Sequence, residues 1–227
     1  MTVLLVLFTF TAFLLIDYFR SRRAAERTLQ VSPAATRHEE VVPRLQPALV
    51  AGFALPENLR YHPGHTWALS ESTNLVRVGM DDFASKLTGT IENIKLPQRG
   101  QWIRQGQKLC TVYHDDIAVD MVSPIEGTVS DINEAVARNA KLALADPYGE
   151  GWLLTVNAPD AKTSFKNLLG GPLARWWTEE SAGRLQRRMP MAFAGALAQD
   201  GGQAICNLAS QIPDKEWLPL AKEFFLS

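Results

Sequence analysis

The chain has few of the residue types that usually carry chemistry. It contains two cysteines, Cys110 and Cys206, and four histidines, of which only His62 and His65 lie close together. Neither set has the spacing of a zinc site, and two isolated cysteines predict buried, reduced thiols rather than a disulfide framework. We therefore expect no metal and no disulfide.

Two further absences narrow the function. The 23 basic and 24 acidic residues give a formal net charge of −1, which provides no electrostatic reason to expect nucleic acid as a partner. The sequence shows no phosphate-binding loop and no Ser-His-Asp pattern, and no pair of carboxylates has a context that suggests catalysis. These absences predict a protein that is not an enzyme.

Apolar residues are plentiful, at 46% of the chain, and a long apolar run stands at its start. Asp17 is the one charged side chain before residue 20. About 20 helical residues cross the roughly 30 Å hydrocarbon core of a bilayer, so residues 1–20 predict a transmembrane anchor. A cleaved signal peptide would need a basic start and small residues at a cleavage site, and neither is present.

The flanks of this run predict its orientation and its membrane contacts. Tyr18 and Phe19 stand where aromatic side chains line the membrane interface. Three arginines follow, Arg20, Arg22 and Arg23, whereas only the terminal amine precedes the run. The positive-inside rule then places the N-terminus outside and the main domain in the cytoplasm, at the inner membrane if the protein is bacterial.

Composition divides the rest of the chain into three parts. Residues 21–58 contain four prolines and little core-forming pattern, and predict an extended tether. Residues 59–160 alternate short apolar runs with glycines and predict a β domain. Residues 161–227 change periodicity and predict an extension of short helices.

The β part contains an internal echo. Gly89–Ile94 (GTIENI) matches Gly127–Ile132 (GTVSDI), 38 residues on. Each copy is a short alternating run that a glycine opens, and each is followed by a run built around Lys-Leu, Lys108–Val112 and Lys141–Ala145. The two halves, taken as matching sets of strands, predict a compact all-β sandwich.

Four stretches in this part resemble one known family. They are Tyr61–Trp67 (YHPGHTW), Val78–Ala84 (VGMDDFA), Ser123–Val129 (SPIEGTV) and Asp146–Trp152 (DPYGEGW). Their order and spacing resemble the biotinyl/lipoyl domain, and more closely the H protein of the glycine cleavage system. The resemblance implies a mainly β fold, the barrel-sandwich hybrid of lipoyl domains, and a carrier that shuttles an aminomethyl group on a lipoyl-lysine.

That lysine is missing. In the family the modified lysine lies eight residues before the proline that corresponds to Pro124, which is the position of Asp116. No lysine occurs from Leu109 through Ala140, and an aspartate cannot form the amide that holds lipoate or biotin. We therefore expect no cofactor. The acidic residues at the tip, Asp115, Asp116 and Asp120, form either a solvated turn or a small cation site or salt-bridged docking tip.

The C-terminal extension carries a heavy aromatic load. Helices are predicted from Thr178 toward Arg188, over Met191–Gln199, and from Pro213 toward Phe225. These side chains either pack on the β domain and on each other, or anchor a partner or the membrane interface. The aromatic residues in question are Trp176, Trp177, Trp217, Phe224 and Phe225.

Together these features favour a non-enzymatic, membrane-anchored accessory subunit that stabilises a larger membrane protein complex, respiratory or photosynthetic in type. Its partners would be integral-membrane subunits and the lipid bilayer. One alternative is a lipoyl-type carrier of glycine cleavage or related metabolism, which a lipoyl mass increment would reveal. Another is an efflux-type membrane-fusion adaptor, which protease accessibility in oriented vesicles would distinguish.

Overall fold

The computed structural model describes residues 48–114, 117–189, 208 and 212–226. They form eleven strands and six helices within one compact unit. The strands are β1 Ala48–Val50, β2 Phe53–Leu55, β3 Arg60–His62, β4 Thr66–Ser70, β5 Leu75–Met80, β6 Asn93–Lys95, β7 Trp102–Ile103, β8 Lys108–His114, β9 Ile117–Val122, β10 Gly127–Ile132 and β11 Leu154–Asn157. The helices are α2 Asp82–Thr88, α3 Glu134–Arg138, α4 Lys141–Ala145, α5 Ala161–Lys166, α6 Gly171–Arg188 and α8 Asp214–Phe225.

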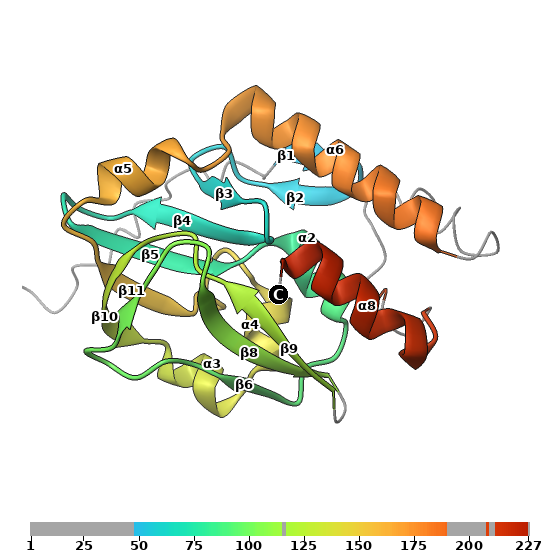
Figure 1. Ribbon diagram of the computed structural model, residues 1–227, viewed down its shortest axis with the longest axis horizontal. Coiled ribbons are helices and arrows are strands. Elements are labelled where there is room, and N and C mark those ends of the chain that lie inside the picture. Colours follow the sequence, from blue (N-terminus) through green and yellow to red (C-terminus); the bar gives the residue numbers. More distant parts are fainter. Residues whose placement is uncertain (1–47, 115–116, 190–207, 209–211, 227) are drawn as a thin grey trace, which may run out of the picture. The chain divides into compact units, whose positions relative to one another are not determined.

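The strands form three antiparallel sheets (Figure 1). A six-stranded sheet has the order β3-β4-β5-β11-β10-β7, a three-stranded sheet has the order β6-β8-β9, and β1 pairs with β2. The expectation of a mainly β domain followed by C-terminal helices is confirmed. The extension is not built only of short helices, because α6 runs for 18 residues.

One hydrophobic core takes side chains from both larger sheets. Val76 and Val78 of β5 face it from one sheet, and Val112 of β8 and Met121 of β9 face it from the other, all without measurable exposure. The intervening residues of β8 and β9 point the other way, as the two-residue period of a strand requires. The hairpin of β8 and β9 therefore has one face in the core and one face open.

The internal sequence repeat is only partly repeated in the structure. Gly127–Ile132 is strand β10, whereas in the first copy only the end, from Asn93 on, lies in a strand. Lys141–Ala145, expected to match the strand at Lys108–Val112, is helix α4. Its sequence, KLALA, consists of strong helix formers, and that preference outweighs the resemblance in pattern.

Two predicted helices of the extension are found, with shifted starts. The helix expected from Thr178 is α6, which begins at Gly171 because Pro172 fits the first turn of a helix. Thr178 is then an interior residue, and its hydroxyl donates to the carbonyl of Ala174 at 2.9 Å. The helix expected after Pro213 is α8. The helix predicted over residues 191–199 lies outside the described residues.

Part of the segment predicted as an extended tether is folded in the structure. From residue 48 on, the chain forms the β1–β2 hairpin, and Val50, Phe53 and Leu55 are buried. No helix among residues 48–114, 117–189 and 212–226 has the length and apolar character to cross a membrane. The predicted anchor, residues 1–20, lies outside the described residues.

Candidate functional site

The hairpin of β8 and β9 is the place where a carrier of this type would present its lysine. Its strands pair to their ends, with His114 opposite Ile117. Asp115 and Asp116, between them, lie outside the described residues, so the nature of this tip stays a prediction. Because no lysine occurs from Leu109 through Ala140, this end of the hairpin has no amine to which lipoate could be attached.

Contacts from two neighbouring segments hold the residue that precedes the tip. His114 is buried, and its Nδ1 lies 2.7 Å from the carbonyl oxygen of Thr90. A carbonyl only accepts, so Nδ1 carries the proton in this contact. The ring of Trp217 in α8 packs on the imidazole with a centroid distance of 4.6 Å. The base of the tip is therefore fixed by the chain's own C-terminal helix.

Helix α8 is fastened by aromatic side chains. Trp217, which is 1% exposed, donates from Nε1 to the carbonyl oxygen of Leu87 at 3.0 Å. Phe224 and Phe225 are buried as well, and Phe224 packs on Phe83 at 5.0 Å. The helix lies against β9 and α2. It is thus an integral layer of the domain beside the hairpin.

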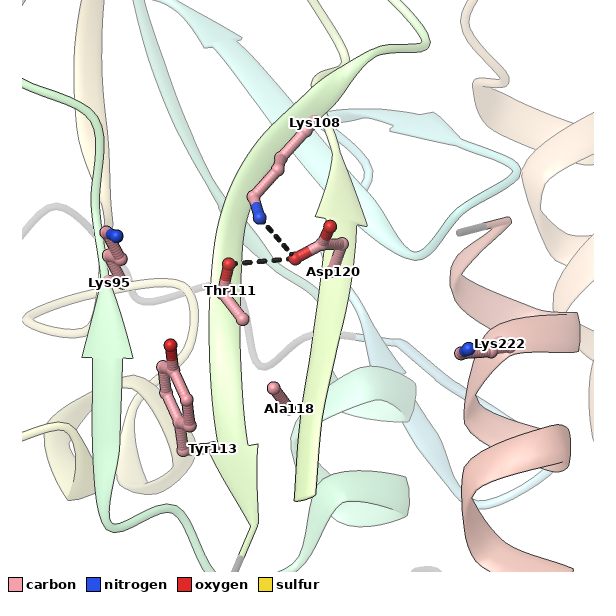
Figure 2. Close-up of a pocket in the computed structure, with 7 residues that line it drawn as sticks. All are labelled: Lys95, Lys108, Thr111, Tyr113, Ala118, Asp120 and Lys222. Atoms are coloured by element: carbon pink, nitrogen blue, oxygen red, sulfur yellow. Dashed lines mark hydrogen bonds and ion pairs between the residues drawn. The ribbon is translucent and has the colours of Figure 1, made fainter. Parts of the chain in front are cut away.

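The open face of the three-stranded sheet forms a pocket of about 400 Å³ (Figure 2). Its floor is set by register: Lys95 of β6 pairs with Thr111 of β8, and Thr111 pairs with Asp120 of β9. Directly paired residues of neighbouring strands lie on the same face, so these side chains form a row across the sheet. The pocket is lined by Lys95, Lys108, Thr111, Tyr113, Ala118, Asp120 and Lys222.

Asp120 is the one acidic residue among the residues that line this pocket. Two donors form hydrogen bonds to its carboxylate. Lys108 Nζ lies 2.7 Å from Asp120 Oδ1, and the hydroxyl of Thr111 donates to the same oxygen at 2.8 Å. Partial burial alone would raise the pKa of Asp120, but the hydrogen bonds from Lys108 and Thr111 and the charges of Lys108 and Lys222 outweigh it and lower the pKa. The carboxylate is therefore ionised at neutral pH and neutralises part of the lysine charge.

The YHPGHTW stretch supplies a buried polar contact rather than an exposed site. His65 Nδ1 lies 2.8 Å from Asp81 Oδ2, and neither residue is more than 2% exposed. The imidazole stacks on Phe83 at 4.0 Å and lies 4.5 Å from the ring of Trp177. Asp81 also caps α2, because its Oδ1 accepts from the backbone N–H of Ala84 at 2.7 Å. The pair ties the start of β4 to the start of α2.

The DPYGEGW stretch is likewise architectural. Asp146 accepts hydrogen bonds from the backbone N–H groups of Gly149 and Glu150. Tyr148 donates from its hydroxyl to the carbonyl oxygen of Ala54 at 2.7 Å, and burial raises its pKa far above the ordinary value. A Cβ at Gly151 would meet the carbonyl oxygen of Leu142 at 2.5 Å, so only glycine fits there. The motif fixes a turn and joins it to β2.

Neither metal ligation nor thiol chemistry is indicated by the residues that the structure describes. They contain no group of three or more histidine, cysteine, aspartate or glutamate side chains that could hold a metal ion. Cys110 is buried, and burial raises the pKa of its thiol to about 12. Cys206 lies outside the described residues. The lysine-lined pocket remains as an accessible polar feature of the described residues beside the hairpin.

Comparison with known proteins identifies the family. The model of the glycine cleavage H-protein family matches residues 59–175, more than half of the 227 residues. The chain belongs to the glycine cleavage H-protein family. Its relatives include the glycine cleavage system H protein of Alteromonas mediterranea, 34% identical over 47% of this chain and 83% of that protein. A probable H protein of Aeropyrum pernix is 34% identical over 53% of this chain and 84% of that protein.

A solved structure is also similar to the chain. The crystal structure of a glycine cleavage system H protein from Mycobacterium marinum matches with a TM-score of 0.48 and 24% sequence identity. The match covers 56% of this chain and 98% of that one. The H-protein match ends at residue 175, so α8 and most of α6 lie outside it.

Of the five aromatic residues predicted as partner contacts, one is exposed and four are buried. Trp176 is 62% exposed on α6, one turn from the exposed Leu173. The other four pack inside the chain itself, because consecutive helical positions face different sides and α8 turns its apolar face to the domain. The buried four are Trp177, Trp217, Phe224 and Phe225. The predicted membrane contacts Tyr18, Phe19, Arg20, Arg22 and Arg23 lie outside the described residues.

The lysine-lined pocket was not predicted from the sequence. Lys95, Lys108 and Lys222 lie on three different elements, and Lys222 is more than a hundred positions from the other two. The alternation of Thr111 and Tyr113 with the apolar residues Cys110 and Val112 in β8 could have indicated a polar face. Nothing local to Lys222 indicates that α8 brings it to that face.

Proposed function

We propose that this member of the H-protein family is a non-lipoylated, non-enzymatic binding subunit of a larger assembly rather than an acyl carrier. One observation carries the proposal: the hairpin that would present the lipoyl-lysine has no lysine from Leu109 through Ala140. Lipoate is held through an amide to a lysine amine, and no other side chain of the hairpin tip supplies one.

The surroundings of the hairpin support this proposal. Lys108 is at the opposite end of β8, where it pairs with Val122, and its amine is engaged by Asp120. Lys95 and Lys222 belong to β6 and α8 rather than to the hairpin. A domain that keeps the fold of the family but lacks the lysine for lipoate attachment can still bind other proteins through its surface.

The carrier alternative draws on family membership. The relatives are glycine cleavage system H proteins by name, which favours a carrier of one-carbon or acyl groups for this chain too. Under that alternative a lysine outside the hairpin tip would have to be modified. The missing lysine is the reason why the binding subunit remains our main proposal.

One isolation from native membranes tests both possibilities. The chain is purified in mild detergent, its intact mass is measured, and the proteins that migrate with it are identified. We expect an unmodified mass and a stoichiometric set of integral-membrane subunits. A lysine-bearing H protein expressed in the same cells is the control for lipoylation. A lipoyl increment on this chain would establish the carrier, and a chain that migrates alone would contradict the subunit.

We further propose that residues 1–20 anchor the protein in a membrane with the domain on the cytoplasmic side. The support is the apolar run with its single acidic residue and the arginines that follow it. Deletion of residues 1–20 is expected to move the protein from the membrane pellet to the supernatant after an alkaline wash. The full chain is the control. If the truncated protein stayed in the pellet, another segment or a partner would be holding it.

A further inference from the structure

The lysine-lined pocket concentrates positive charge in a chain that is nearly neutral as a whole. Three lysines line it against the single carboxylate of Asp120, while the formal net charge of the protein is −1. Lys108 is paired with that carboxylate. Lys95 and Lys222 are exposed and form no ion pair with any residue that the structure describes. Lys95 and Lys222 thus lie on either side of the Lys108–Asp120 ion pair (Figure 2), and neither has an ion-pair partner among the described residues.

The geometry of the sheet spaces these two charges. Lys95 and Asp120 are separated by one intervening strand, so strand spacings of about 4.8 Å put their backbones about 10 Å apart. Lys222 comes from α8, which packs along the far side of β9. Figure 2 shows Lys95 and Lys222 on opposite flanks of the β8–β9 hairpin, with Tyr113 and Ala118 between them.

The positions of these two lysines indicate which class of ligand could bind both. Lys95 lies on β6 and Lys222 lies on α8, on opposite flanks of the hairpin (Figure 2), so a ligand that pairs with both must extend across the sheet. On an extended peptide, side chains that share a face recur about every 7 Å, so an acidic peptide presents carboxylates at several points across the hairpin. The half-buried ring of Tyr113 offers a surface for the peptide between them.

We propose that this pocket binds an acidic, extended segment of a partner protein, with Lys95 and Lys222 each pairing with one of its carboxylates. The inference rests on the proposed function, because it assigns the partner surface of the binding subunit. Lys222 lies outside the region that matches the H-protein family model, so the pocket is completed by the C-terminal extension of this chain.

Binding of a model peptide tests the chemistry. The full chain in detergent micelles is titrated against fluorescein-labelled hexaglutamate at low ionic strength, and fluorescence anisotropy gives Kd. Lys95→Glu and Lys222→Glu are each expected to weaken binding about fivefold, the size of a reversed surface charge pair. Lys162→Glu is the matched control, since Lys162 is an exposed lysine of α5 with the same charge change, and it should leave Kd within about twofold.

Three results would overturn the inference. One is an equal loss of affinity in the Lys162→Glu control, which would make the binding a general charge effect. Another is displacement of the peptide by inorganic phosphate that persists when either Lys95 or Lys222 is replaced, which would indicate a small-anion site. The third is the absence of any peptide binding by the wild-type chain. Matched thermal melting curves for all variants exclude unfolding as the cause.

The native assembly separates this inference from the proposed function. The Lys95→Glu/Lys222→Glu variant is isolated from membranes beside the wild type. We expect the partner subunits to be depleted with the variant at least fivefold. If the variant retained them in full, the pocket would not be the partner surface and the inference would fail while the proposed function stood. If the wild type itself retained none, the proposed function would fail.

Discussion

Trp217→Ala is expected to lower the free energy of unfolding of the domain by about 3–5 kcal/mol, the range for deletion of a fully buried tryptophan. Trp217 is 1% exposed, its indole N–H is bonded to Leu87, and its ring covers His114. The substitution removes the side chain that fastens α8 and leaves the Leu87 carbonyl without its donor. Denaturant unfolding of the full chain measures the loss, and limited proteolysis reports release of α8.

The chain provides its own control for this substitution. Trp176→Ala removes the same side chain from an exposed position on α6, and it should change the unfolding free energy by no more than about 0.5 kcal/mol. Equal losses for both variants would contradict the packing described for α8. A large loss for Trp176→Ala alone would mean that α6, not α8, is the critical layer.

The expected result bears on how the hairpin works. Here the residue before the tip is held between Thr90 and α8, and the helix that holds it lies outside the family match. The absent lysine and the contacts that hold His114 are separate features, and both support the proposed binding role.

The family and the mainly β character could be predicted because they depend on local sequence. VGMDDFA contains the Asp81 cap of α2, and DPYGEGW contains the turn at Asp146; the hydrogen bonds of both lie within the stretch itself. The sequence pattern does not predict helix α4, because KLALA resembles the Lys-Leu run of β8 although its residues are strong helix formers. The predicted helix start at Thr178 is wrong, since α6 begins at Gly171; Gly-Gly-Pro at residues 170–172 is compatible with a helix end as well as with a helix start.

The candidate site was predictable only in part, for a physical reason. The absence of a lysine is a property of sequence alone. The pocket, in contrast, needs Lys95 and Lys222 on one face, and their meeting depends on how α8 packs. Which of Trp176 and Trp177 is buried depends in the same way on the rotation of α6 about its axis, since neighbours on a helix point about 100° apart.

The buried pair of His65 and Asp81 leads to the second large effect, because removing its carboxylate breaks two contacts at once. Asp81→Ala removes the N-cap of α2, worth about 0.5–2 kcal/mol, and leaves the buried His65 without its Nδ1 partner, worth about 1–3 kcal/mol. We therefore expect a combined loss of about 2–4 kcal/mol of unfolding free energy. Chemical denaturation of the full chain gives the value.

Two further variants test whether the loss comes from the cap and from the buried contact with His65. Asp81→Asn keeps an acceptor for the α2 cap and should recover part of the loss, since asparagine caps helices as well as aspartate does. Asp131→Ala makes the same substitution in an ion pair with Arg99 whose side chains are 54% and 51% exposed, and it should cost less than about 1 kcal/mol. If Asp81→Ala were no more destabilised than Asp131→Ala, the pair would not be what joins β4 to α2. The YHPGHTW stretch would then need a role in recognition rather than in the fold.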